Sequence, residues 1–102
     1  MDVPVKIILT WDIAAEHEQE YFEFVLGDFV PGVQRLGLLP SDAWATMFGD
    51  YPQIQVGMIS PSLEQAQQAI NSDGWRTLQD KLYNFVHNYT CKVIPARGGF
   101  QF

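Results

Sequence analysis

The amino-acid sequence predicts a single α+β domain, residues 1–102, whose elements follow the order βαββαβ. Residues 3–11 place an apolar side chain at every second position, which is the period of a strand. Residues 22–36 carry apolar side chains at spacings of three and four, as one side of a helix does. The length of 102 residues matches one domain of ordinary size.

The first half of the chain predicts one strand and one long helix. The strand covers residues 3–11, and Asp12 is expected to cap the N-terminus of the helix. The helix reaches about Leu36, where Gly37 is a typical stop residue. Pro31 lies inside this helix. Because proline has no amide hydrogen, we expect a kink or break between Gly27 and Pro31.

The middle of the chain predicts a β-hairpin. Residues 43–48 and 53–59 are rich in strand-forming side chains. Between them, residues 49–52 read Gly-Asp-Tyr-Pro, a sequence typical of a turn. The second and third strands are therefore expected to be antiparallel neighbours.

The last part of the chain predicts an interrupted helix and a final strand. Pro61 is expected at an early helix position, where no amide donor is needed. Residues 72–74 interrupt this helix, and its second segment extends to about His87. Residues 89–94 form the last strand.

Right-handed crossovers fix how these elements assemble. Applied to both βαβ units, they give an antiparallel sheet in the order 4-1-3-2 with both helices on one face, which is a ferredoxin-like arrangement. The side chains expected to face the helices are Val5, Ile7, Leu9, Ile54, Val56, Met58, Cys91 and Val93. Cys91 is therefore expected to be a buried, unreactive thiol.

The other face of the sheet is more apolar than a wet surface usually is. Ile8, Ile59, Ile94 and Trp44 are expected there, between polar side chains. Exposed apolar patches of this kind are uncommon on monomers, and two-fold dimers are the commonest oligomers. We therefore expect a homodimer that pairs through this face, with an open monomer as the alternative.

One stretch of the chain resembles a known group of proteins. Residues 29–38, Phe-Val-Pro-Gly-Val-Gln-Arg-Leu-Gly-Leu, are similar to the helix ending that precedes the second strand in the dimeric α+β barrel superfamily. The element order and Trp75 also fit that group. The resemblance implies two ferredoxin-like subunits packed sheet to sheet. It implies no particular reaction, because the group includes antibiotic-biosynthesis-monooxygenase-like proteins, haem-handling enzymes, isomerases and uncharacterised bacterial proteins.

Charge and cysteine content restrict the partners. Twelve acidic residues against six basic ones give a net charge of −6, which disfavours nucleic acids and anionic membranes. One cysteine allows no intrachain disulfide. The sequence shows neither a secretory leader nor a long apolar run, so a cytoplasmic location is expected.

A first candidate site lies at one end of the predicted sheet. The end of the first strand meets the start of the fourth, which brings Trp11, Asp12, His17, His87 and Tyr89 together. Histidine is the commonest acid–base side chain near neutral pH, so His17, His87 and Tyr89 are the catalytic candidates. A surface role for both histidines is the alternative. No spacing of His and Cys residues predicts a metal site, and we expect no cofactor.

A second candidate site lies on the sheet face away from the helices. The predicted ligand-binding side chains, besides Trp11, are Lys6, Thr10, Trp44, Gln55 and Lys92. Lys6 and Lys92 share this face on neighbouring strands. Two like charges in a partly enclosed place favour an anionic group between them, from a ligand or from the partner chain. The alternative is that both lysines extend to the mouth of the barrel.

These candidates give three functional hypotheses. The first is a dimer that binds a small apolar or partly anionic molecule in the barrel cavity. The second, implied by the resemblance, is a cofactor-free monooxygenase in which Trp44 stacks on an aromatic substrate and a His or Tyr handles the proton. The third is a haem-handling protein that uses Trp75 and His87, although the spacing of these residues fits that group poorly.

Overall fold

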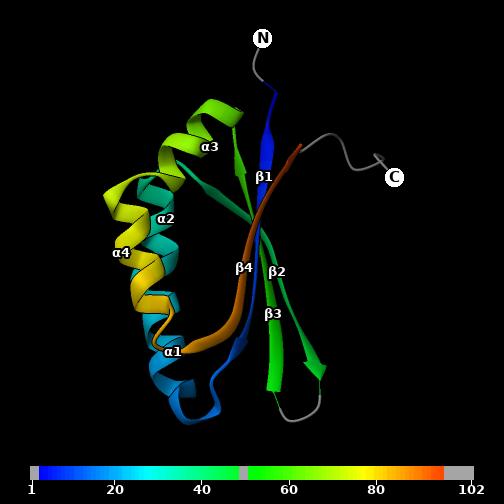
Figure 1. Cartoon of the computed structure of the whole chain (residues 1–102), viewed down its shortest axis with the longest axis vertical. Helices are drawn as coiled ribbons and strands as arrows, with labels where there is room; N and C mark the ends of the chain where they lie inside the picture. Colours follow the sequence, from blue (N-terminus) through cyan, green and yellow to red (C-terminus); the bar gives the residue numbers. More distant parts are fainter. Residues whose placement is uncertain (1–2, 49–50, 96–102) are drawn as a thin grey trace.

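A four-stranded antiparallel sheet with helices on one face makes up the computed structural model, which describes residues 3–48 and 51–95 (Figure 1). The strands are β1 (Val5–Ile13), β2 (Leu39–Phe48), β3 (Tyr51–Ser60) and β4 (Val86–Pro95). Their order in the sheet is β2-β3-β1-β4, and every neighbouring pair is antiparallel. The predicted order and the predicted ferredoxin-like α+β fold are both confirmed.

The helix layer follows the predicted segments with local differences. Its elements are η1 (Ala15–His17), α1 (Glu18–Phe24), η2 (Val25–Phe29), α2 (Val30–Arg35), α3 (Leu63–Ile70) and α4 (Asp73–Leu82). The first helical region ends as predicted, because Gly37 adopts a φ of 87°, which glycine reaches without steric cost. In the described part of the chain, no helix has the length and apolar character needed to cross a membrane.

The predicted break in the first helix is a π-helical turn. The segment η2 covers Val25–Phe29, directly before α2. Pro31 cannot donate the amide hydrogen that the carbonyl group of Gly27 would accept in an α-helix. A wider turn at this point accommodates the missing hydrogen bond, and such turns occur often at functional sites.

Asp12 does not cap a helix. β1 continues to Ile13, and Asp12 pairs with Gln53 on β3 and with His87 on β4. The side-chain amide of Asn88 donates a hydrogen bond of 2.8 Å to the Asp12 carboxylate. The carboxylate is therefore held by β4, away from the helix N-terminus where the sequence pattern suggested it.

Two serines begin the helices of the second half. The Ser62 hydroxyl accepts from the Gln65 amide at 3.1 Å, so α3 begins after Ser62 and Pro61 precedes the helix. The Ser72 hydroxyl accepts from the Trp75 amide at 3.2 Å and caps α4 at the predicted interruption. Both are ordinary N-cap contacts.

Several strand and helix ends differ from the prediction. α4 ends at Leu82 and β4 begins at Val86, so residues predicted as helix belong to the last strand. Within the predicted turn, residues 49–50 lie outside the described residues, whereas β3 already begins at Tyr51.

The core lies between the helices and the middle strands. Ile7, Leu9 and Met58 are completely buried there, as predicted. The prediction that Cys91 is buried was wrong: its residue is exposed, and Val93 is 37% exposed. Both lie on the helix-facing side of β4, opposite Leu9 and Ile7. The helices pack over β1 and β3 and leave this end of the edge strand uncovered.

The open face of the sheet carries exposed apolar side chains. Leu39 is 63% exposed, Trp44 is 52% exposed and Ile94 is 39% exposed. The strand pairing places all three on the side away from the helices. The apolar character predicted for this face is therefore present in the structure.

Candidate functional site

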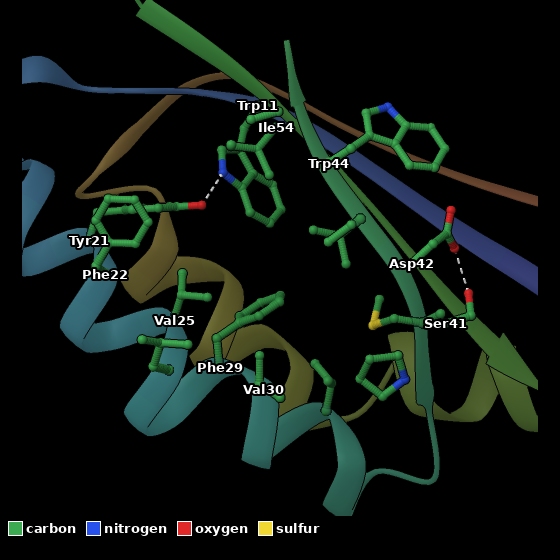
Figure 2. A pocket seen from close by; sticks show the side chains of 17 residues that line it. Trp11, Tyr21, Phe22, Val25, Phe29, Val30, Ser41, Asp42, Trp44 and Ile54 are labelled. Atoms are coloured by element: carbon green, nitrogen blue, oxygen red, sulfur yellow. Dashed lines mark hydrogen bonds between the residues drawn. The ribbon is translucent and has the colours of Figure 1, made fainter.

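An apolar cavity of about 550 Å³ lies between the first helical region and the edge of the sheet formed by β2 and β3 (Figure 2). α1 contributes Phe22 to its lining, and η2 contributes Val25 and Phe29. Ala43 and Ile54 are on the sheet side. A cavity of this size and apolar lining is typical of a small-molecule site.

Small side chains on β2 make room for this cavity. Ala43 and Ala45 pair with Val56 and Ile54 of β3 and so occupy the helix-facing side of the strand. Their methyl groups do not fill the distance to the first helical region. The π-helical turn borders the same space, because Val25, Leu26 and Phe29 all line the cavity. Figure 2 shows the Trp44 indole on the other side of β2 from Val25 and Phe29.

One buried hydrogen bond supplies the polar character of the cavity wall. The indole N–H of Trp11 donates to the Tyr21 hydroxyl at 2.9 Å, and Figure 2 shows the two rings side by side. Trp11 is 1% exposed and Tyr21 is 3% exposed. Burial raises the pKa of Tyr21, and the hydrogen bond from Trp11 only partly opposes it. The phenol is therefore protonated at neutral pH.

Aromatic neighbours hold the Trp11 indole in place. It stacks on Tyr89 of β4, with centroids 6.4 Å apart and ring planes 10° apart. Phe29 meets it edge to face at 6.0 Å. Contacts of this kind add to the burial energy of aromatic rings. Trp11 therefore presents its N–H group in a fixed direction.

The three predicted catalytic residues lie outside this cavity. His17 Nδ1 is 3.2 Å from Glu20 Oε1, and the His17 ring packs against Phe85. His87 is exposed and lines a polar hollow of about 260 Å³. The Tyr89 hydroxyl donates to Gln79 Oε1 at 2.9 Å, and burial raises the pKa of Tyr89.

The predicted cluster at the end of the sheet forms in part. Asp12 and His87 are partners across β1 and β4, and Trp11 stacks on Tyr89. The two pairs are on opposite sheet faces, because Trp11 faces the helices and Asp12 does not. Among the described residues, no group of three His, Cys, Asp or Glu side chains is arranged to hold a metal ion.

The predicted ligand-binding residues other than Trp11 share the open face of the sheet, although Trp44 also borders the cavity from β2. Their pairing is Lys6 with Ile94, Thr10 with Gln55 and Thr90, Trp44 with Gln55, and Lys92 with Ile8. The hydroxyl groups of Thr10 and Thr90 form a hydrogen bond with each other. The anionic group that the sequence predicts beside the two lysines comes, for Lys6, from Asp42 of the same chain, at 3.0 Å.

The Asp42 carboxylate is held by two neighbours. The Ser41 hydroxyl donates to it at 2.6 Å, and Lys6 approaches it from β1. The hydrogen bond from Ser41 and then Lys6 hold the pKa of Asp42 below its usual value. Asp42 is therefore a poor general base at neutral pH, because it binds a proton weakly.

Comparison with solved structures relates this fold to known proteins. A NIPSNAP family protein from Agrobacterium tumefaciens superposes with a TM-score of 0.70 and 13% identity, over 97% of this chain and 90% of that one. SnoaB, a cofactor-independent oxygenase from Streptomyces nogalater, gives 0.69 and 12% identity, over 97% and 98%. An ethyl tert-butyl ether D family protein from Bacillus halodurans gives 0.64 and 19%, over 88% and 95%.

The chain has the ferredoxin-like α+β fold of these proteins. The predicted resemblance is thereby confirmed at the level of the fold. No family model matches the sequence. No curated protein matches it either. At these identities the shared fold assigns no reaction, because one fold supports many activities.

The structure also separates the two residues of the haem hypothesis. Trp75 is 3% exposed and belongs to the core under α4. His87 is exposed at the end of the sheet, beside Asp12. Trp75 offers no accessible ring surface to a large planar cofactor, so this arrangement favours the other two hypotheses.

Proposed function

We propose that this protein binds a small, largely apolar molecule in the cavity between the first helical region and β2. The observation that supports this proposal is the combination of size and lining. About 550 Å³ of space is bordered by apolar and aromatic side chains, with the hydroxyl of Tyr21 as a buried polar group. Sites for small organic molecules have this composition, because burial provides affinity and a few polar groups provide orientation.

The polar groups of the open face make that face a weaker candidate for the ligand. Lys6 is paired with Asp42, and Thr10 is hydrogen-bonded to Thr90. A ligand on this face would have to replace contacts that the protein already makes. The cavity on the helix side requires no such exchange.

The open face is better suited to a second copy of the chain. Leu39, Trp44 and Ile94 are exposed there and lie on three sides of the Lys6–Asp42 pair. Packing two such faces together removes the apolar side chains from water, which is the main driving force of association. We therefore propose a homodimer in which each subunit keeps its own cavity.

An oxygenase activity is the second candidate. It is supported by the fold shared with SnoaB, which is a cofactor-independent oxygenase, and by the aromatic lining of the cavity. Such a reaction on a phenol requires removal of a proton. The titratable residues of the lining are Tyr21, whose pKa is raised, and Asp42, whose pKa is lowered and whose carboxylate pairs with Lys6 on the open face. Neither is a good base at neutral pH, so binding is favoured over acid–base catalysis.

Nile red, a neutral dye whose fluorescence increases in apolar surroundings, tests the binding proposal. Two adjacent positions of β2 provide a matched pair. Ala45 faces the helices and lines the cavity, whereas Thr46 faces the other way. We expect Ala45→Phe to weaken dye binding at least ten-fold by filling the space. Thr46→Phe should change it less than two-fold.

The two variants also show on which side of the sheet the dye binds. Weaker binding in Thr46→Phe and unchanged binding in Ala45→Phe would place the dye on the open face and contradict the proposal.

Oxygen uptake with an electron-rich phenol tests the second candidate, an oxygenase activity. Uptake that requires active protein and stops in Ala45→Phe would support an oxygenase, and no uptake above the rate without protein would exclude it for that substrate.

A further inference from the structure

We infer that the ligand of this cavity is a flat, neutral molecule with a carbonyl-type oxygen, and that this oxygen accepts a hydrogen bond from the hydroxyl of Tyr21. The inference rests on the proposed function, since it describes the chemistry of the molecule that the cavity binds. It follows from the hydrogen-bonding capacity of two buried side chains, Trp11 and Tyr21.

The Tyr21 hydroxyl retains an unused donor. An indole N–H can only donate, so Tyr21 must be the acceptor in the hydrogen bond of 2.9 Å from Trp11. A phenol also carries a hydrogen of its own. Among the described residues, no side-chain or backbone acceptor takes that hydrogen. Tyr21 is 3% exposed and lines the cavity, so a ligand there is within reach of the donor.

The lack of a cation in the cavity lining favours a neutral acceptor. No Lys or Arg contributes to the lining, and the Asp42 carboxylate pairs with Lys6 on the open face of the sheet. Transferring a carboxylate from water into apolar surroundings is costly unless a cation or several donors compensate. One phenol hydroxyl is not enough for that purpose. A ketone or a similar carbonyl group loses much less hydration and needs only one donor.

The aromatic rings that border the cavity favour a flat ligand. Tyr21, Phe22 and Phe29 present aromatic rings to the cavity. The contacts of Trp11 with Tyr89 and Phe29 fix the direction of its N–H group, and this in turn fixes the Tyr21 hydroxyl. A donor that is already oriented loses little conformational freedom when the ligand binds.

Two probes of nearly the same shape test this inference. 9-Fluorenone carries a carbonyl oxygen where fluorene carries a methylene group. Their dissociation constants are measured by displacement of Nile red from wild-type protein and from Tyr21→Phe. We expect the preference for fluorenone over fluorene to fall about five-fold in Tyr21→Phe, which is the effect of one neutral hydrogen bond. Fluorene-9-carboxylate should bind more weakly than either probe.

Tyr83→Phe is the matched control, because Tyr83 is 47% exposed and lies outside the cavity lining. Its preference for fluorenone should equal that of the wild type. An unchanged preference in Tyr21→Phe, with both probes still bound, would overturn the inference and leave the proposed function intact. Failure of both neutral probes to displace the dye, or of the dye to bind, would contradict the proposed function itself.

Infrared spectroscopy of the wild-type complex gives a test that does not depend on the folding of a variant. A carbonyl group that accepts a hydrogen bond absorbs at a lower frequency than the same group in an apolar solvent. We expect bound fluorenone to show this lower frequency. A frequency equal to that in heptane would overturn the inference, because the carbonyl oxygen would then have no donor.

Discussion

Lys6 and Asp42 form an ion pair of 3.0 Å directly over Gly57, on the sheet face that the helices leave open. A Cβ atom at Gly57 would overlap the Asp42 carboxylate and lie 2.5 Å from Lys6 Cε. The pair therefore needs glycine at this position of β3. The reason is space and not backbone conformation, since Gly57 is not among the residues with positive φ.

We expect Gly57→Ala to separate the ion pair at little cost in stability. The atoms that the new methyl group meets are the ends of two side chains that can move, and partly exposed ion pairs contribute only about 0–1 kcal/mol. The free energy of unfolding in urea should fall by less than about 1 kcal/mol. In Gly32→Ala, the new methyl group would lie 2.6 Å from the Leu78 side chain, which packs against the core, and the loss should be larger, about 1–3 kcal/mol.

The pKa of Asp42 should rise when either of its two neighbours is removed. The hydrogen bond from Ser41 is the first cause of its lowered pKa, and Lys6 lowers it further through a hydrogen bond and through its charge. NMR titration of the carboxyl carbon should therefore show a higher pKa in Ser41→Ala and in Lys6→Met than in the wild type. An unchanged pKa in Ser41→Ala would contradict the role of its hydroxyl.

The same pKa has a consequence for stability in acid. A carboxyl whose pKa is lower in the folded state stabilises the fold above its unfolded pKa, and this contribution is lost as the pH falls through the folded value. We expect Ser41→Ala to reduce the stability difference between pH 6 and pH 2. Unfolding in urea at the two pH values measures this difference.

The Trp11–Tyr21 hydrogen bond should contribute measurably to stability. In Tyr21→Phe the buried indole N–H of Trp11 loses its acceptor, and an unpaired buried donor costs about 1–3 kcal/mol. Tyr83→Phe removes a hydroxyl from an exposed ring and should change stability by less than about 0.5 kcal/mol. Equal changes in the free energy of unfolding in the two variants would show that the buried hydrogen bond does not stabilise the fold measurably.

The proposed dimer predicts that charge on the open face causes dissociation. Trp44→Lys should raise the dissociation constant at least ten-fold, because an ammonium group buried without a partner opposes association. Leu63→Lys is the control, because Leu63 is 49% exposed at the start of α3, in the helix layer. Sedimentation velocity at several concentrations measures both. A wild-type protein that sediments as a monomer at all concentrations would refute the dimer.

Local sequence patterns predicted most of the fold, because the deciding interactions are local. The alternation in residues 3–11 reflects a strand whose one side is buried, and Ile7 and Leu9 are fully buried as expected. The sheet order follows from the handedness of crossovers, which depends little on particular side chains. Pro31 located the irregular turn, since its missing amide hydrogen affects only its own neighbourhood.

The errors arose where packing between elements decides the outcome. Alternation placed Cys91 on the helix side of β4, but only the position of the helices determines whether that side is covered. Asp12 has the residue type of a helix cap, yet pairing with β4 extends the strand past it. Neither the exposure of Cys91 nor the extension of β1 past Asp12 can be predicted from residue type and spacing alone.

The sequence-based hypothesis placed the cavity on the open face of the sheet, whereas the proposed function places the ligand on the helix side. The volume of the cavity on the helix side depends on the distance between the first helical region and β2, a tertiary property. Two signals were nevertheless present. Ala43 and Ala45 are small residues at helix-facing positions of a strand, and the break at Pro31 borders the same space. Trp11 and Trp44, both chosen as ligand-binding residues, do line the cavity.

The indole N–H resonances of Trp11, Trp44 and Trp75 test the central claim most directly. In ¹⁵N–¹H spectra of the protein, each indole gives one signal, assigned by single Trp→Phe variants. On addition of 9-fluorenone, we predict that the Trp11 signal moves, because its hydrogen-bond partner Tyr21 borders the occupied cavity. The Trp75 signal should stay in place, because Trp75 does not line the cavity, and the Trp44 signal should move less than that of Trp11, because the Trp44 indole lies on the other side of β2. Movement of the Trp44 signal with an unchanged Trp11 signal would place the ligand on the open face and contradict the account.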